Sequence, residues 1–360
     1  MVLDRLPSHQ TGIITLPDLT LGISSDVPIP ELRDDDMILV HNQAVALNPT
    51  DFKMPAAFPS PGAVDGADFA GDVIRVGPNV TKWKVGDRIF GAVQGANPQN
   101  HEAGAFQGYV STYEREVLRI PDSMSYETAA SIGGACIGTA AISLYCSLGI
   151  QPLPLGDPPA KRLHVLIYGG STATGIMAIQ MVRLSGHILI ATCSPNNCDF
   201  VKSYGAEAVF DYHSRTCAAD IKAYTANTLG HVLDCITIRS SMKICYDSMG
   251  RMGGRYTAIE LPPEVPGLRK VVKRDWVMGM TITGRPVELG KGYEFPVVPQ
   301  HAEFGRIWAP LCQKLIDEGW IKPHRVRECE GGWEGILRGL EELKMKKVSA
   351  EKLVYRVHWT

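Results

Sequence analysis

The sequence predicts an α/β protein in which an irregular β-barrel precedes a doubly wound parallel sheet. Its 360 residues suit two domains better than one core. Up to about residue 130, short strand patterns alternate with turns. After the proline-containing linker 151–162, apolar strands alternate with helices. We therefore expect a barrel domain over 1–137, a nucleotide-binding domain over 138–295, and a return to the barrel domain over 296–360.

The composition is that of a soluble globular protein. Hydrophobic residues make up 45% and charged residues 21%, and the net charge of −2 argues against a nucleic-acid surface. The nine cysteines are scattered, without C-x-x-C spacing, which indicates reduced thiols rather than disulfides or a zinc knot. The N-terminus lacks the apolar region of a secretory signal, and the uncharged runs 129–150 and 163–182 are interpreted as buried core. We expect a cytoplasmic protein.

Each predicted element follows from a local pattern. Alternation and turn residues predict the barrel strands, and Ser125 caps the first helix signal. Continuous apolar runs predict parallel strands buried on both faces. The expected barrel strands lie within 37–49, 70–80, 83–93 and 104–124, with a helix from 125; the sheet strands lie within 163–170, 187–194, 207–212, 231–237, 253–261 and 280–284; the helices between them lie at 174–186, 199–205 and 217–228; two helices within 306–320 and 332–345 and a strand within 351–359 close the chain.

A glycine-rich turn follows the first sheet strand. Gly170, Thr172 and Gly175 occupy the positions of a G-x-G-x-x-G pattern between a strand and a helix. A phosphate needs close backbone approach there and N–H groups at a helix N-terminus. The hydroxyls of Ser171, Thr172 and Thr174 are additional candidate donors. The alternative is a turn that serves only packing.

The end of the second sheet strand indicates which nucleotide binds. An NAD site usually carries an acid there for the ribose 2′-hydroxyl, whereas this chain has Ser194, Pro195, Asn196 and Asn197. The missing carboxylate favours NADPH. Candidate cations for the 2′-phosphate are Arg215 and Lys202. Tyr212 either flanks the adenine or the phosphate, or is an aromatic residue at the edge of the core.

Six motifs together resemble the medium-chain dehydrogenase/reductase superfamily over nearly the whole chain. They are NPTD (48–51), GADFAG (66–71), VGDRIFG (85–91), GAFQGYV (104–110), YGGSTATG (168–175) and SAEKLVYRV (349–357). The resemblance implies a GroES-like barrel and a Rossmann domain. Zinc-dependent members have a cysteine at Asn48 and a histidine at Ala67. Cys136 only approximates another ligand position, and one thiolate cannot hold zinc. We expect no metal, and hence reduction of an activated acceptor rather than alcohol oxidation.

Within the zinc-free branch, the chain resembles fungal trans-acting enoyl reductases of polyketide biosynthesis, for which the lovastatin enzyme is the model. The shared sequence segments include YGGSTAT, IATCSP and LDCIT. The resemblance implies NADPH-dependent reduction of the C=C bond of an α,β-unsaturated polyketide thioester. The thioester is carried by the acyl carrier protein of a partner polyketide synthase, or of its hybrid with a peptide synthetase. The alternatives are a free-standing quinone or alkenal reductase and a non-catalytic, crystallin-like NADPH-binding protein.

The site residues follow from the motifs and this resemblance. Lys53 is the candidate catalytic residue, because it can contact the thioester carbonyl. Phe58 stands near where mitochondrial relatives have a proton-donating tyrosine, which leaves water or Lys53 as donor. The cofactor contacts are Thr50, Asp51, Phe52, Lys53, Ser171, Thr172, Ala173, Thr174, Ser194, Pro195, Asn196, Asn197, Tyr212, Ile259, Glu260 (where we would expect Asn), Val348 and Ser349; the acyl pocket is Thr139, Ala140, Ala141, Ile142, Ser143, Leu144, Tyr145, Cys146, Gly279, Met280, Thr281, Ile282 and Thr283.

The sequence also predicts a monomer. Related quinone reductases pair through the edge strand of the nucleotide-binding sheet. Here the segments 260–267 and 284–290 carry prolines, which cannot donate to a β-ladder. Lys270, Lys273 and Arg274 add charge nearby and suit an acidic carrier protein. The alternative is that the prolines only shape loops.

Overall fold

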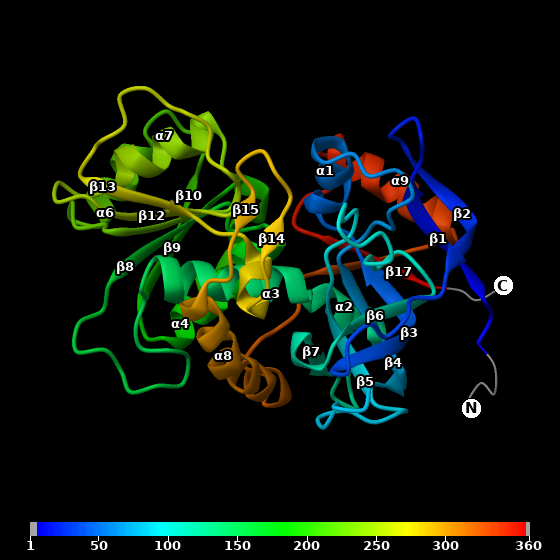
Figure 1. Cartoon of the computed structure of the whole chain (residues 1–360). Coiled ribbons are helices and arrows are strands. Elements are labelled where there is room, and N and C mark those ends of the chain that lie inside the picture. Colours follow the sequence, from blue (N-terminus) through cyan, green and yellow to red (C-terminus); the bar gives the residue numbers. More distant parts are fainter. Residues whose placement is uncertain (1–5, 358–360) are drawn as a thin grey trace. The chain divides into compact units, whose positions relative to one another are not determined.

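The computed structural model describes residues 6–357, and these form two compact units (Figure 1). The first unit comprises Met1–Ala135, Glu288–Glu294 and Ala309–Thr360, and the second comprises Cys136–Val287 and Phe295–Trp308. The division falls inside helix α8 (Pro299–Asp317), which the expected domain bounds leave whole. Those expected bounds stay a prediction.

The first unit is built on a mostly antiparallel sheet that wraps a buried apolar core. Its strand order is β16-β17-β3-β4-β5-β7, with β6 also paired to β3. Phe69, Phe90 and Phe106 are among its fully buried side chains. The strands are β3 (Met37–Ala46), β4 (Asp68–Val76), β5 (Arg88–Ala92), β6 (Tyr109–Tyr113), β7 (Val117–Arg119), β16 (Val326–Cys329) and β17 (Lys352–Arg356), beside the hairpin β1 (His9–Thr15) and β2 (Leu21–Pro28). This confirms the expected GroES-like barrel.

Among the described residues, three α-helices lie wholly within the first unit. Helix α1 (Pro49–Ala57) begins directly after β3, and α9 (Gly332–Lys344) lies beside it. Helix α2 (Tyr126–Ile132) begins where expected, because the Ser125 hydroxyl accepts from the backbone N–H of Thr128. Helix α1 was not predicted from the sequence, because the strand pattern of β3 continues up to the proline at which the helix begins.

The second unit is a six-stranded parallel sheet with the order β10-β9-β8-β11-β12-β13. Helices separate the successive strands from β8 to β12, as in a doubly wound fold, and this confirms the predicted Rossmann domain. The strands are β8 (His164–Tyr168), β9 (Ile188–Cys193), β10 (Ala208–Asp211), β11 (His231–Asp234), β12 (Gly254–Ala258) and β13 (Val272–Trp276), with helices α3 (Gly134–Ala141, which begins in the first unit), α4 (Ala173–Leu184), α5 (Cys198–Ser203), α6 (Cys217–Tyr224) and α7 (Arg239–Ser248).

The strand expected at 280–284 is wrong. Residues Gly279–Thr283 form a 3₁₀ turn, η4, and β13 is the edge strand instead. The hydroxyls of Thr281 and Thr283 donate to the backbone carbonyls of Met278 and Met280, so the turn satisfies its own polar groups. Local side-chain bonding therefore overrides the β-propensity of this alternating segment.

The sequence predicts that prolines prevent pairing at the edge of the nucleotide-binding sheet, but the prolines do not lie in the edge strand. Pro262, Pro263 and Pro266 lie in the loop between β12 and β13, and none lies in the edge strand. The edge strand instead exposes the charged residues Lys273, Arg274 and Asp275. Charge is the other common protection of an edge against pairing. A second hairpin, β14 (Val287–Glu288) with β15 (Glu294–Phe295), follows η4.

One helical stretch in the described residues, Tyr126–Ser147, is long and apolar enough by composition to cross a membrane. It is not one regular helix: α2 ends at Ile132, α3 begins at Gly134, and the six residues Ile142–Ser147 form a π-helical turn. Of its most apolar window, 72% is buried. We interpret the stretch as core, as the sequence analysis did.

Candidate functional site

The turn between β3 and α1 carries the segment predicted to meet the cofactor. Asn48 precedes the helix, and Pro49 fills its first position, where a missing N–H costs nothing. The Asp51 carboxylate accepts a hydrogen bond of 2.7 Å from the backbone N–H of Asn48. The side chain of Asp51 is thus buried and committed to the helix N-terminus, while Thr50 and Lys53 are exposed and Phe52 is half-buried.

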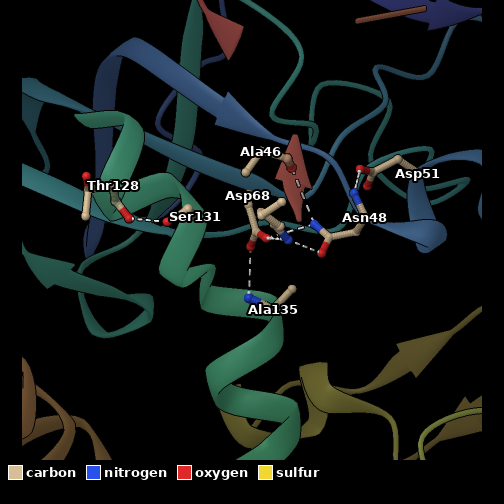
Figure 2. Close-up of polar contacts among 8 residues, drawn as sticks. Ala46, Asn48, Asp51, Asp68, Thr128, Ser131 and Ala135 are labelled. Atoms are coloured by element: carbon tan, nitrogen blue, oxygen red, sulfur yellow. Dashed lines mark hydrogen bonds and ion pairs between the residues drawn. The ribbon is translucent and has the colours of Figure 1, made fainter. Parts of the chain in front are cut away.

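A buried ion pair lies beside this turn. The Lys352 ammonium is 3.0 Å from the Asp68 carboxylate, and the two side chains are 3% and 0% exposed. Lys352 Nζ also donates to Asn48 Oδ1. Asn48 in turn donates from Nδ2 to Asp68 Oδ2 at 2.8 Å, as Figure 2 shows for these two labelled side chains. Ammonium, carboxylate and amide therefore form a closed triangle.

Strand order explains why residues so far apart in sequence meet. Strand β3 lies between β17 and β4, with Val354 opposite Ala46 and Ala46 opposite Asp68. Antiparallel register places Lys352 opposite the residue two beyond the end of β3, which is Asn48. From the sequence, Asp68 was named only as part of the GADFAG turn, and Lys352 was not identified as a site residue. No local signal marks either residue.

The same carboxylate meets the start of α3. The backbone N–H of Ala135 donates to Asp68 Oδ1 at 3.0 Å (Figure 2). Gly133 makes this approach possible, because a Cβ on it would lie 2.6 Å from Asp68 Oδ2, and its φ of 68° disfavours other residues. Asp68 is therefore an acceptor for the first turn of the helix that carries Thr139–Ala141.

Two more buried carboxyls lie near this network. Burial raises the pKa of Asp51 to about 8, and the neighbouring charge of Asp68 adds to the shift. Burial likewise raises the pKa of Asp65 well above its usual range, and the charge of Asp51 contributes. Among the described residues, no hydrogen-bond partner is found for Asp65 Oδ2. Burial and the mutual repulsion of carboxylates therefore favour the neutral forms of Asp51 and Asp65.

In the second unit, the glycine-rich turn has the geometry expected of a phosphate cradle. The Thr172 hydroxyl accepts from the backbone N–H of Gly175 at 3.0 Å and caps α4. It donates to the carbonyl of Gly169 at 2.8 Å, so this hydroxyl is engaged within the turn rather than offered as a donor. A Cβ on Gly175 would collide with the Gly169 carbonyl oxygen. The remaining first-turn N–H groups of α4 are the kind that bind phosphate.

The carboxyl ends of β9 and β10 lie side by side, because Asp211 is opposite Cys193. Ser194 accepts from the Asn197 amide at 3.1 Å, and Tyr212 is 37% exposed. The Tyr212 ring lies 4.1 Å from that of His213, which forms an ion pair with Asp211 when protonated. His213 is a nearby imidazole that was not among the residues predicted from the sequence. Lys202 and Arg215 are both exposed.

The two segments predicted to line the acyl pocket meet in the second unit. Gly279 packs so closely on Thr139 that a Cβ would overlap the threonine hydroxyl. Tyr145, in contrast, is buried, with its hydroxyl 3.0 Å from Ser185 Oγ and its ring near Trp308. Burial raises its pKa far above the usual range. The Tyr145 side chain therefore packs in the core of this unit.

The remaining predicted contacts lie at two strand ends. Ile259 and Glu260 directly follow β12, and the Glu260 carboxylate accepts from the backbone N–H of Leu261. Val348 and Ser349 lie four and three residues before Lys352, the first residue of β17. Within residues 6–357, no group of three or more His, Cys, Asp or Glu side chains is arranged to hold a metal ion.

Comparison with known proteins adds the family context. The model described as alcohol dehydrogenase GroES-like domain matches residues 34–122, and the one described as zinc-binding dehydrogenase matches residues 173–284. The chain is 44% identical to "Trans-enoyl reductase ccsC" of Aspergillus clavatus, over 98% of each chain. It is 45% identical to "Trans-enoyl reductase FSL5" of Gibberella zeae, again over 98% of each.

A solved structure supports the fold. The crystal structure of the CurK enoyl reductase superposes with a TM-score of 0.75, covering 97% of this chain and all of that one. The sequence identity is 18%, so this likeness concerns the fold alone. The same two-domain architecture thus recurs in a protein of low sequence similarity.

Proposed function

Because this chain belongs to the trans-enoyl reductase family, and is therefore an enoyl reductase of the medium-chain dehydrogenase/reductase superfamily, we propose that it reduces a polyketide C=C bond with NADPH. The substrate is an α,β-unsaturated thioester on the acyl carrier protein of a partner polyketide synthase. The near-full-length identity to the two trans-enoyl reductases carries this proposal. Bound NADPH supplies the hydride.

The residues of the glycine-rich turn fit a dinucleotide. Gly175 lies against the Gly169 carbonyl and has no side chain to obstruct a phosphate. The N-terminus of α4 favours an anion. At the end of β9, the neutral Ser194, Asn196 and Asn197 leave room for a 2′-phosphate without repulsion. These features support NADPH over NADH.

On the substrate side, Lys53 is the proposed contact to the thioester carbonyl. It is exposed on α1, directly after the buried turn that fixes the helix. An ammonium there stabilises the negative charge that develops on the oxygen as the β-carbon receives hydride. The other proposed contacts are those of the sequence analysis, at α1, at the phosphate turn, at the ends of β9, β10 and β12, and before β17.

We further propose a cytoplasmic, metal-free monomer. The position expected for a zinc-binding histidine is Ala67, and its neighbour Asp68 is already paired with an ammonium. The charged edge strand β13 disfavours sheet pairing between copies. Metal analysis should find no stoichiometric zinc. Light scattering should give a mass near 39.2 kDa rather than its double.

The test compares three acceptors with the purified protein: an enoyl thioester of a carrier-protein mimic, a short alkenal and a quinone. We expect NADPH oxidation to be fastest with the thioester, and NADPH to bind more tightly than NADH by fluorescence titration. Preference for the quinone or alkenal would identify a free-standing reductase. Tight NADPH binding without any turnover would identify a crystallin-like binding protein.

A variant at Lys53 tests its role. Lys53→Ala should lower kcat by roughly 100- to 1000-fold, the range expected when one charge-stabilising group is lost. Its affinity for NADPH should change less. An unchanged kcat would assign Lys53 to the solvated surface.

A further inference from the structure

We propose that the Lys352–Asp68 ion pair is a positioning device for the reaction, holding the N-termini of α1 and α3 in one fixed arrangement. The inference rests on the proposed function, since α1 carries Thr50 and Lys53 while α3 carries Thr139. Neither Lys352 nor Asp68 touches a reacting atom in this scheme. Both act through the two helices.

The contacts of Asp68 show how one carboxylate reaches both helices. Its Oδ1 accepts from Ala135 N–H in the first turn of α3, at 3.0 Å. Its Oδ2 accepts from the side chain of Asn48, the residue that precedes α1, at 2.8 Å. Lys352 contacts the same Oδ2 and the Oδ1 atom of Asn48, so it locks the amide in one orientation. Charge-assisted bonds in a buried setting make such an arrangement rigid.

The surroundings show that the carboxylate depends on its cation. Asp68 is fully buried, and the nearby Asp51 and Asp65 are acids as well. Lys352 is the cation that the structure pairs with Asp68. A buried pair of this kind gains little net stability over apolar residues, yet losing one partner is costly. Its presence therefore suits a positioning role better than a stabilising one.

The location agrees with that role. The resemblance places zinc-binding residues of metal-dependent relatives at positions 48 and 67, and here Asn48 and the neighbour of Ala67 bind an ammonium instead. The Lys352 ammonium thus contacts one of these two positions and the neighbour of the other. It organises the same turn without binding substrate.

The experiment uses the full chain and a charge-neutral double variant. We compare Lys352→Met, Asp68→Asn and Lys352→Met/Asp68→Asn for thermal stability, NADPH affinity, and kcat and KM with an enoyl thioester. Each single variant leaves one buried charge unpaired, so we expect both to be less stable than the double variant. The double variant should recover stability but keep a kcat at least 10-fold below wild type. Lys352→Arg, which keeps the charge, should retain more kcat than Lys352→Met.

Hydrogen exchange separates this inference from the proposed function. In the double variant, amides of residues 49–58 and 134–141 should exchange faster, while those of β11 and β12 stay unchanged. A double variant that regains wild-type kcat, or one whose α1 and α3 amides stay fully protected, overturns the positioning role. If wild type reduces no enoyl thioester, the proposed function fails, and the exchange result still decides the role of the ion pair.

Discussion

The ion pair of the first unit and the phosphate turn of the second are organised in opposite ways. The first is assembled from residues 284 positions apart in sequence and depends on buried charge. The second is made by the seven consecutive residues 169–175 and depends on the absence of side-chain volume and on backbone donors. The comparison teaches that charge substitutions should disable the first region, whereas volume substitutions should disable the second.

The largest effect is expected at the phosphate turn. Gly175→Val puts a branched side chain against the Gly169 carbonyl, which no rotamer avoids. We expect a loss of roughly 3 kcal/mol in the free energy of unfolding, within the usual range for backbone collisions, and no measurable NADPH titration. Calorimetry and fluorescence titration check this.

A matched control is Gly230→Ala. The nearest atom to a Cβ at this position lies 3.8 Å away, and its φ is not positive. Stability and NADPH affinity should stay close to wild type. Equal damage from both substitutions would mean that volume at the turn is not the cause.

A charge substitution in the first unit should show a pH dependence. The pKa of Asp65 is raised in the folded protein, so its neutral form is favoured there. The unfolded chain ionises it near pH 4, and wild type therefore loses stability as the pH rises above that value. Asp65→Asn removes this loss.

We expect Asp65→Asn to match wild type near pH 4 and to raise Tm at pH 9 by roughly 2–4 °C, the shift that ~1 kcal/mol produces. Thermal melts across pH 4–9 measure it. A Tm difference independent of pH would show that Asp65 is ionised throughout and that its burial is compensated in another way.

The smallest effect concerns the cap of α4. Thr172→Ala removes the hydroxyl that accepts from Gly175 N–H, and should cost about 1 kcal/mol with a modest loss of NADPH affinity. Thr172→Ser keeps the hydroxyl and should stay near wild type. If the serine variant is as unstable as the alanine variant, the threonine methyl group rather than the cap matters, as denaturant titration would reveal.

Features made by neighbouring residues could be predicted from the sequence, whereas contacts between distant residues could not. Gly170, Thr172 and Gly175 lie within six residues, so their pattern predicted the turn, and alternating apolar runs predicted both folds. Lys352 could not be predicted as a partner of Asp68, because their contact depends on how β17, β3 and β4 are ordered. Propensity also misled at Gly279–Thr283, where threonine hydroxyls bond to the backbone of their own turn.

The position of β17 has a consequence for synthesis on the ribosome. This strand lies between β16 and β3 inside the sheet of the first unit, yet it is translated more than 300 residues after β3. The nascent chain can complete every strand of the parallel sheet before Lys352 leaves the exit tunnel. Until then the end of β3 at 44–46 lacks its partner strand β17, and the acid at position 68 lacks its counter-ion. The nascent first unit is thus the part of the chain that would occupy a chaperone longest.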